Sequence, residues 1–183
     1  RGPEARRGRR MSTAVALALK EKAGDLAAHG GYHRLLLLVG PPRSGKTTAV
    51  REFATEVGWP RLNLNLVLSE RLLDVPSRFR QIRVLELLRE VAEAAPGNGL
   101  VLDNIELLFQ RSLQVDPLQA LLALSRSRVV VAAWCGDYSD TALTYAAPGH
   151  AEYRHYPEPG CTILPVGVNA TRVSKRASKG SRA

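Results

Sequence analysis

The sequence has few of the residues from which metal centres are built and no stretch that would cross a membrane. Its only two cysteines, Cys135 and Cys161, form no C-x-x-C pair and have no histidine at ligand spacing, which argues against a zinc site. We expect two buried free thiols in a reducing compartment. No apolar run approaches the roughly 18 residues of a membrane span, and no signal peptide is visible. These absences predict a cytoplasmic protein.

The body of the chain has no excess of either charge, although the formal net charge is +9. Residues 1–10 hold five arginines and one glutamate, and residues 171–183 hold five basic residues and no acid. Residues 11–170 hold 16 basic and 16 acidic residues. We therefore expect one domain over residues 11–168 between two disordered basic segments, 1–10 and 169–183. DNA contact through these segments stays open, because basic segments attract anionic polymers, although most are simply solvated.

One stretch carries a strong functional signal. Residues 35–39 are four leucines and a valine, which predicts a strand buried on both faces. Residues 40–47 then fit the P-loop motif G-x-x-x-x-G-K-[ST], whose backbone N–H groups surround phosphate oxygens at the start of a helix. The motif predicts binding of ATP with Mg²⁺, in which Lys46 contacts the phosphates and the Thr47 hydroxyl ligates the metal. The residues predicted to contact the nucleotide are Gly40, Pro41, Pro42, Arg43, Ser44, Gly45, Lys46, Thr47 and Thr48.

A second acidic residue is needed to hold Mg²⁺, and it should follow a buried strand beside the first. The segment Leu100–Asp103 meets this requirement, so Asp103 is the predicted partner of Thr47. Many ATP-hydrolysing relatives have glutamate at the next position, whereas this chain has Asn104. An amide has no basic site near neutral pH and cannot take a proton from water. Glu106 is the alternative base, or else a surface carboxylate, and we expect slow or partner-dependent hydrolysis.

An arginine that would stabilise charge on the transferred phosphate is not obvious from the sequence. Arg126 and Arg128 are the first candidates by topology, followed by Arg111 and Arg154, and each has an ordinary surface role as the alternative. ATPases of the AAA+ kind often carry a polar sensor residue after the fourth strand. This chain has Trp134-Cys135-Gly136 there, and it also lacks an evident helical lid. An Arg-rich lid typical of small-molecule kinases is also absent from residues 137–147.

The order of elements predicts an α/β P-loop NTPase fold. Helical or strand periodicity alternates along the chain, which is typical of a three-layer αβα sandwich with about five mostly parallel strands. We expect an AAA-like core without an evident helical lid. The predicted strands are residues 35–39, 61–66, 100–103, 128–134 and 161–166, and the predicted helices are residues 12–29, 46–57, 77–95, 117–125 and a short one within 137–147. Residues 150–159 are expected to form a loop. Asp116 is the expected cap of helix 117–125, Gly58 ends helix 46–57, and the apolar stripe of helix 77–95 includes Phe79 and Ile82. Asn63 and Asn65 are either functional or, more commonly for such residues, polar positions on the wetter face of strand 61–66.

The segment from residue 143 to 156 combines two histidines, His150 and His155, with Tyr145, Tyr153 and Tyr156. Adenine stacking or partner docking is one interpretation. A structural role is the commoner one for such side chains at the edge of a loop, and we favour it.

Several of these segments together resemble a known family. The sequences LLLLVGPPRSGKTT, LNLNLVLSERLLD, LVLDNIELLF, DPLQALLALSRSR, VVVAAWCG and LTYAAPGHAEY are similar to the BrxF family, the small P-loop proteins of type III BREX bacteriophage-exclusion systems. The likeness extends from about residue 35 to residue 156. The P-loop alone is not specific. The DNIELLF, WCG and YAAPGH segments make the resemblance specific.

This resemblance implies a bacterial cytosolic ATP-binding component of an anti-phage defence system. It maps the family's nucleotide site onto Gly40, Gly45, Lys46, Thr47 and Asp103. The implied partners are other BREX proteins, including a large ATPase, a methyltransferase and a phosphatase-like protein, and a homo-oligomer stays open. The alternatives are a nucleotide-binding switch without hydrolysis, a small-molecule P-loop kinase and a DNA-binding accessory protein.

Overall fold

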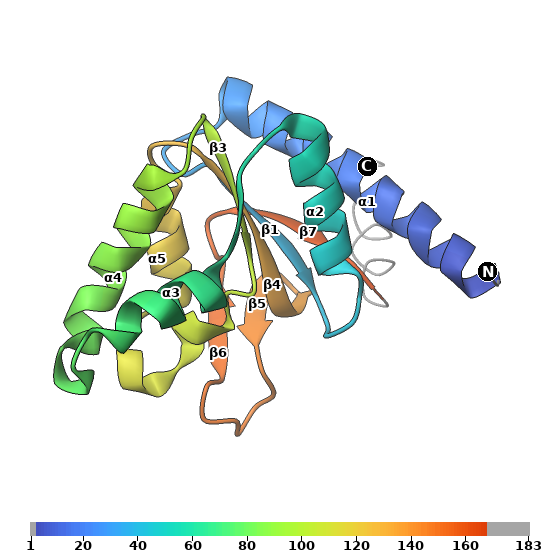
Figure 1. Ribbon diagram of the computed structural model, residues 1–183. Helices are drawn as coiled ribbons and strands as arrows, with labels where there is room; N and C mark the ends of the chain where they lie inside the picture. Colours follow the sequence, from blue (N-terminus) through green and yellow to red (C-terminus); the bar gives the residue numbers. More distant parts are fainter. Residues whose placement is uncertain (1–2, 168–183) are drawn as a thin grey trace.

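Five parallel strands form the centre of the computed structural model, which describes residues 3–167 (Figure 1). Their order across the sheet is β2-β3-β4-β1-β7, with parallel pairing at every step. The five strands are β1 (Leu35–Gly40), β2 (Arg61–Asn63), β3 (Gly99–Asp103), β4 (Val129–Ser139) and β7 (Thr162–Pro165). The prediction of about five mostly parallel strands is therefore confirmed.

Alternate side chains of the central strands pack against two different helical layers. On one face, Leu36 and Leu38 pack with α1 (Pro3–His29) and α2 (Lys46–Val57). On the other face, Leu35 and Leu37 pack with α3 (Leu64–Leu73), α4 (Ser77–Ala94) and α5 (Pro117–Leu124). Since both faces are covered, β1 is buried along its whole length. The fold is the predicted three-layer αβα sandwich.

The first helix is longer than predicted. Helix α1 begins at Pro3 instead of near Ser12, so residues 3–10 are helical and the expectation of a disordered segment there is wrong. The helix extends past α2, and its first turns project away from the sheet (Figure 1). Among residues 3–167, no helix is long and apolar enough to cross a membrane. The predicted C-terminal segment 169–183 lies outside the described residues.

The alternating segment RLNLNL is divided between two elements. Only Arg61–Asn63 is strand, and α3 begins at Leu64, so the predicted strand over residues 61–66 is too long. The Asn63 side chain accepts a hydrogen bond from the Leu66 N–H and caps the helix. Leu64 and Leu68 are fully buried at a spacing of four residues. The sequence predicted a strand because Leu64 fits the alternation typical of a strand as well as the four-residue spacing typical of a helix.

A β-hairpin replaces the short helix predicted within residues 137–147. Strand β4 continues to Ser139 and pairs with antiparallel β5 (Ala142–Tyr145), which pairs in turn with β6 (Arg154–Pro157). The prediction of a loop over residues 150–159 is thus also wrong for β6. Asp140 and Thr141 form the two-residue turn, both with positive φ. Such φ values match a type I′ hairpin, but Asp-Thr lacks the glycine that usually signals one.

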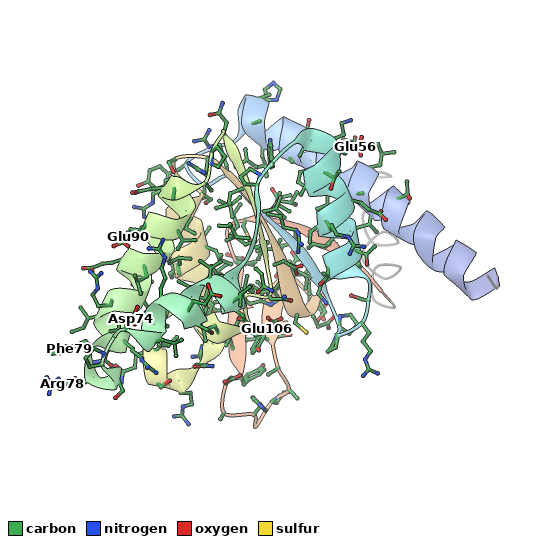
Figure 2. The ribbon with its side chains drawn as sticks, viewed as in Figure 1. Glu56, Asp74, Arg78, Phe79, Glu90 and Glu106 are labelled. Atoms are coloured by element: carbon green, nitrogen blue, oxygen red, sulfur yellow. The ribbon has the colours of Figure 1, made fainter. Side chains whose placement is uncertain are left out.

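The apolar stripe predicted for α4 is only partly buried. Val84, Leu87 and Leu88 face the core, whereas Phe79 and Ile82 are 44% and 62% exposed, so their predicted inward orientation is wrong. Figure 2 shows Phe79 at the outer end of α4. Helix α5 begins at Pro117 after the predicted Asp116 cap, which accepts a hydrogen bond from the Gln119 N–H. Two short 3₁₀ helices, η1 (Glu106–Phe109) and η2 (Arg111–Leu113), connect β3 to α5.

Candidate nucleotide-binding site

The P-loop connects the carboxyl end of β1 to the first turn of α2. A side chain at position 40 would approach the Val166 carbonyl oxygen to 2.6 Å and Ser44 Oγ to 2.9 Å, so the space admits only glycine. Gly45, directly before α2, has a φ of 87°, which a glycine adopts without strain. The loop therefore turns its backbone tightly in front of the positive end of a 12-residue helix. This is the arrangement on which anion binding by a P-loop depends.

Lys46 is held inside the loop. Its Nζ atom donates to the carbonyl oxygens of Gly40 and Pro41, both at 2.7 Å, and to Ser44 Oγ at 3.2 Å. The side chain is buried, and this burial lowers the pKa of Lys46, against the opposing effects of Cys135, Glu106 and Asp103. Gly40 and Pro41 thus act through their carbonyl groups.

Asp103 ends β3 beside the P-loop, as predicted. Its side chain is 2% exposed, and its Oδ1 atom accepts a hydrogen bond from Thr47 Oγ1 at 3.2 Å and from the Asn104 N–H at 3.1 Å. The Oδ2 atom pairs with Arg61 Nη1 at 3.1 Å. The structure therefore brings the predicted metal ligands Thr47 and Asp103 into contact. It also adds Arg61, a residue that the sequence analysis did not single out.

Glu106 begins η1 and faces the same space as Asp103 and Lys46. Its Oε2 atom accepts a hydrogen bond from Asn65 Nδ2 at 3.4 Å, while Asn65 Oδ1 accepts one from the Leu107 N–H at 2.7 Å. The backbone at Asn104 turns with a φ of 51°, which directs the chain from β3 into this 3₁₀ helix. Asn65 was expected to be a polar residue on a strand face. It lies in α3 and fixes the position of Glu106 instead.

Lys46, Asp103 and Glu106 line a cavity of about 420 Å³. Glu106 is seen near the centre of the molecule in Figure 2. Asp103 and Glu106 are the two carboxylates among the lining residues, and Lys46 and Arg43 supply the positive charge. The full lining consists of Pro42, Arg43, Ser44, Gly45, Lys46, Thr47, Thr48, Asp103, Asn104, Glu106, Ala133 and Cys135. Residues from the P-loop, the first turn of α2, β3 and β4 therefore converge at the carboxyl ends of the parallel strands, where parallel α/β folds bind ligands.

Cys135 lies in this cavity, opposite Gly40 in the pairing of β4 with β1. It was expected to be a buried structural thiol, and it is instead partly exposed to the cavity. Burial raises the pKa of the Cys135 thiol, Lys46 opposes that rise, and Glu106 adds to it. Cys135 is thus the last residue of β4 that pairs with β1, where a polar sensor residue was sought.

The first two arginine candidates do not reach the cavity beside the P-loop. Arg126 and Arg128 precede the amino end of β4, whereas the P-loop follows the carboxyl ends of the parallel strands. Arg128 donates to the Ala95 carbonyl oxygen at 2.9 Å, and the Arg126 guanidinium lies 5.0 Å from the centre of the Tyr32 ring. Arg111 and Arg154 also lie outside the lining of the cavity. The prediction that Arg126 and Arg128 are the arginines nearest to the phosphates is therefore wrong for residues of the same chain.

The late tyrosines pack against other side chains in the structure. The Tyr145 ring stacks on Phe109 with ring centres 3.4 Å apart, and the Tyr156 hydroxyl donates to Asp116 Oδ1 at 3.2 Å. His150 accepts a hydrogen bond from the Glu152 N–H within its own turn. None of these side chains lines the cavity, which supports the structural interpretation over adenine stacking.

Residues 36–133, more than half of the chain, match the sequence profile of the ATPase family associated with various cellular activities, AAA. The chain belongs to the AAA family. The match extends from β1 into β4 and includes the P-loop, Asp103 and Glu106. A comparison with curated proteins found no match. The solved structure of C. elegans PCH-2 is similar over 87% of this chain and 42% of its own, with 15% identity and a TM-score of 0.42. This chain thus spans less than half the length of that structure.

Membership in the AAA family supports nucleotide binding at this cavity, typically with Mg²⁺. One feature of this chain departs from the pattern expected of AAA+ ATPases. Cys135 stands at the position of the polar sensor residue.

Proposed function

We propose that this chain binds ATP with Mg²⁺ in the cavity beside Lys46 and hydrolyses it slowly or only when a partner is bound. The observation that carries this proposal is the convergence of the P-loop, Thr47 and Asp103 on one cavity. A backbone loop that excludes any side chain at position 40 and presents a buried ammonium group suits phosphate oxygens. A hydroxyl in contact with a carboxylate suits Mg²⁺, which prefers oxygen ligands. The residues present therefore fit a magnesium nucleotide.

Each residue would have a distinct task with the nucleotide bound. The loop N–H groups and Lys46 would hold the β and γ phosphates, and Thr47 with Asp103 would hold the metal. Mg²⁺ neutralises charge on the phosphates and orients them for attack. Burial lowers the pKa of Lys46, so contact with phosphate oxygens would favour its charged form.

Glu106 is the residue best placed to accept a proton from an attacking water. Asp103 is already bonded to Thr47 and Arg61, and the Asn104 amide has no basic site. The Glu106 carboxylate is itself bonded to Asn65, so it would have to leave or share that hydrogen bond to act as a base. Slow basal turnover follows from this arrangement. A nucleotide-binding switch without hydrolysis is the second candidate, which the amide at position 104 favours.

The nucleotide proposal is tested with two variants. Lys46→Ala should weaken binding of a fluorescent ATP analogue by about 100-fold, because charged hydrogen bonds are lost. The control is Lys20→Ala, which removes an exposed lysine paired with Glu56 on the protein surface. Glu106→Gln should retain binding and lose about 100-fold or more in phosphate release if Glu106 is the base.

Two results would contradict this account. Full binding by Lys46→Ala would remove the nucleotide site from the P-loop. If the wild-type protein binds ATP but releases no phosphate, even with DNA and partner proteins present, the switch replaces the enzyme.

We further propose that this nucleotide site serves a bacterial BREX anti-phage system in the cytosol. Support comes from the resemblance to the BrxF family and from where the segments that carry it lie. Phe109 of the DNIELLF segment contacts Trp134 of WCG, with ring centres 5.0 Å apart, and stacks on the tyrosine of LTYAAPGHAEY. Asp103, Asn104, Glu106 and Cys135 from the same segments line the cavity. The expected partners are the large ATPase, the methyltransferase and the phosphatase-like protein of such a system.

A phage-plating assay tests the defence role. In a host that depends on this chain, Lys46→Ala should restore plaque formation to that of a deletion strain, while Lys20→Ala should protect like wild type. Tagged wild-type protein should co-purify with the methyltransferase or the large ATPase. Unchanged protection by the Lys46→Ala strain, or a gene neighbourhood without these partners, would count against the BREX assignment.

A further inference from the structure

Asp103 forms an ion pair with Arg61, a residue that does not line the nucleotide cavity. Arg61 Nη1 lies 3.1 Å from Asp103 Oδ2, and the two side chains are 34% and 2% exposed. The other ion pairs among residues 3–167 join side chains that are each 44% or more exposed. Arg61–Asp103 is thus the one that involves a buried carboxylate.

The pairing of β2 with β3 explains how Arg61 reaches this carboxylate. Arg61 lies opposite Val101, and Asn63 lies opposite Asp103, in a parallel register. Val101 packs with residues of α2, so Arg61 and Asp103 share the face of the sheet that α2 covers. Since β2 is an edge strand and Arg61 is not part of the cavity lining, the guanidinium approaches Asp103 from outside the cavity.

The two oxygens of Asp103 therefore have separate partners. Oδ1 accepts from Thr47 Oγ1 and the Asn104 N–H, on the side of the cavity, and Oδ2 accepts from Arg61. A buried carboxylate without a cation carries a large desolvation cost, and a carboxylate bonded through one oxygen only is free to rotate. Replacing a residue that hydrogen-bonds to a metal ligand, without itself contacting the metal, typically lowers metal affinity by about 10- to 100-fold.

We propose that Arg61 is a positioning residue for the metal end of this site. It fixes the carboxylate of Asp103 so that Oδ1 stays beside Thr47. This inference rests on the proposed function, because it needs a magnesium nucleotide. A different role, in which Arg61 only joins the edge strand to the sheet, would affect stability without affecting metal dependence.

The experiment compares Arg61→Met and Arg61→Lys with wild type and with Arg71→Met. Arg71 is a matched control, since it forms an exposed pair with Glu90 on the surface helices. Affinity for a fluorescent ATP analogue is measured with excess Mg²⁺ and with EDTA, and Mg²⁺ is titrated at fixed nucleotide. The melting temperature of each variant is recorded without ligand.

The expected result is specific to the metal. Arg61→Met should need about 10- to 100-fold more Mg²⁺ to reach the same nucleotide affinity, and its affinity in EDTA should match that of wild type. Arg61→Lys should recover part of the effect, because it restores charge without the planar fork. Arg71→Met should behave as wild type. If Arg61→Met does not fold, the Mg²⁺ requirement of Arg61→Lys, still raised relative to wild type, supports the inference.

Other outcomes separate the inference from the proposed function. If wild type binds nucleotide and Arg61→Met shows the same Mg²⁺ dependence, or loses equal affinity in both buffers, the inference fails while the proposed function stands. If the wild-type protein binds no nucleotide in either buffer, the proposed function fails and the inference falls with it.

Discussion

At the scale of single residues, the cavity contains an unusual side chain for a nucleotide site. Cys135 occupies the end of β4 within the parallel pairing, directly before the backbone turns into the hairpin. Burial raises the pKa of this thiol, so little of the reactive thiolate is present near neutral pH. Burial also raises the pKa of the second cysteine, Cys161, to about 12. Both pKa values are raised, and the two thiols differ in location, since Cys135 lines the cavity and Cys161 does not.

Alkylation should report occupancy of the cavity through Cys135. We expect slow reaction with iodoacetamide at pH 8 and faster reaction at pH 10, because the thiolate fraction rises with pH. Bound magnesium ATP should slow the modification of Cys135 and leave that of Cys161 unchanged, as Cys161 lies outside the cavity lining. Mass spectrometry of the two cysteine peptides measures both rates in one sample. Equal protection of both cysteines would instead indicate a general tightening of the fold.

At the scale of elements, the hairpin and the turn that carries Glu106 form one packed unit. Phe109 of η1 is fully buried, stacks on Tyr145 of β5 and meets the edge of Trp134 in β4. Trp134 Nε1 also donates to the Thr144 carbonyl oxygen at 2.8 Å. The position of Glu106 therefore depends on aromatic contacts from strands that follow it by more than 20 residues.

Replacement of Phe109 by alanine should be strongly destabilising. We expect a loss of about 3–5 kcal/mol in the free energy of unfolding, as for other buried aromatic residues. Phe79→Ala is the control, because Phe79 is 44% exposed on α4 and stacks only with the Arg78 guanidinium, 4.7 Å from its ring centre. Its expected loss is below about 1 kcal/mol. Urea denaturation followed by circular dichroism measures both, and similar losses would refute the packing described here.

At the scale of the whole molecule, the residues that we propose to contact the nucleotide and the metal gather at the carboxyl ends of the parallel strands. The P-loop and Glu106 follow the carboxyl ends of β1 and β3, Asp103 is the last residue of β3, and Cys135 is the last residue of β4 that pairs with β1. Arg126 and Arg128 lie at the amino ends of the parallel strands, opposite to the cavity. An arginine that stabilises the transition state would therefore have to come from elsewhere, such as a partner or a second copy. Partner-dependent hydrolysis is consistent with that geometry.

The sequence by itself determined the parts of the site that depend on local chemistry. Three features could be read from short stretches of sequence, because each belongs to a single strand or turn. They are the P-loop motif, the apolar run before it and the acid after Leu100–Leu102. The alternation of strands and helices, which produces a parallel sheet, then placed Lys46 and Asp103 together at the carboxyl ends of the strands. Helix ends with clear signals, such as Asp116-Pro117 and Gly58, were also predicted correctly.

Only the tertiary structure decided which polar side chains serve the site. Arg61 gave no signal in the sequence, and the alternating pattern around Asn65 favoured a polar position on a strand. Their roles depend on the pairing of β2 with β3 and on where α3 begins. The hairpin was missed because its turn uses Asp140 and Thr141 at positive φ without a glycine. Contacts between residues about 40 positions apart, such as Arg61 with Asp103 and Asn65 with Glu106, arise from strand order and packing. Local periodicity contains no information about such distant pairs.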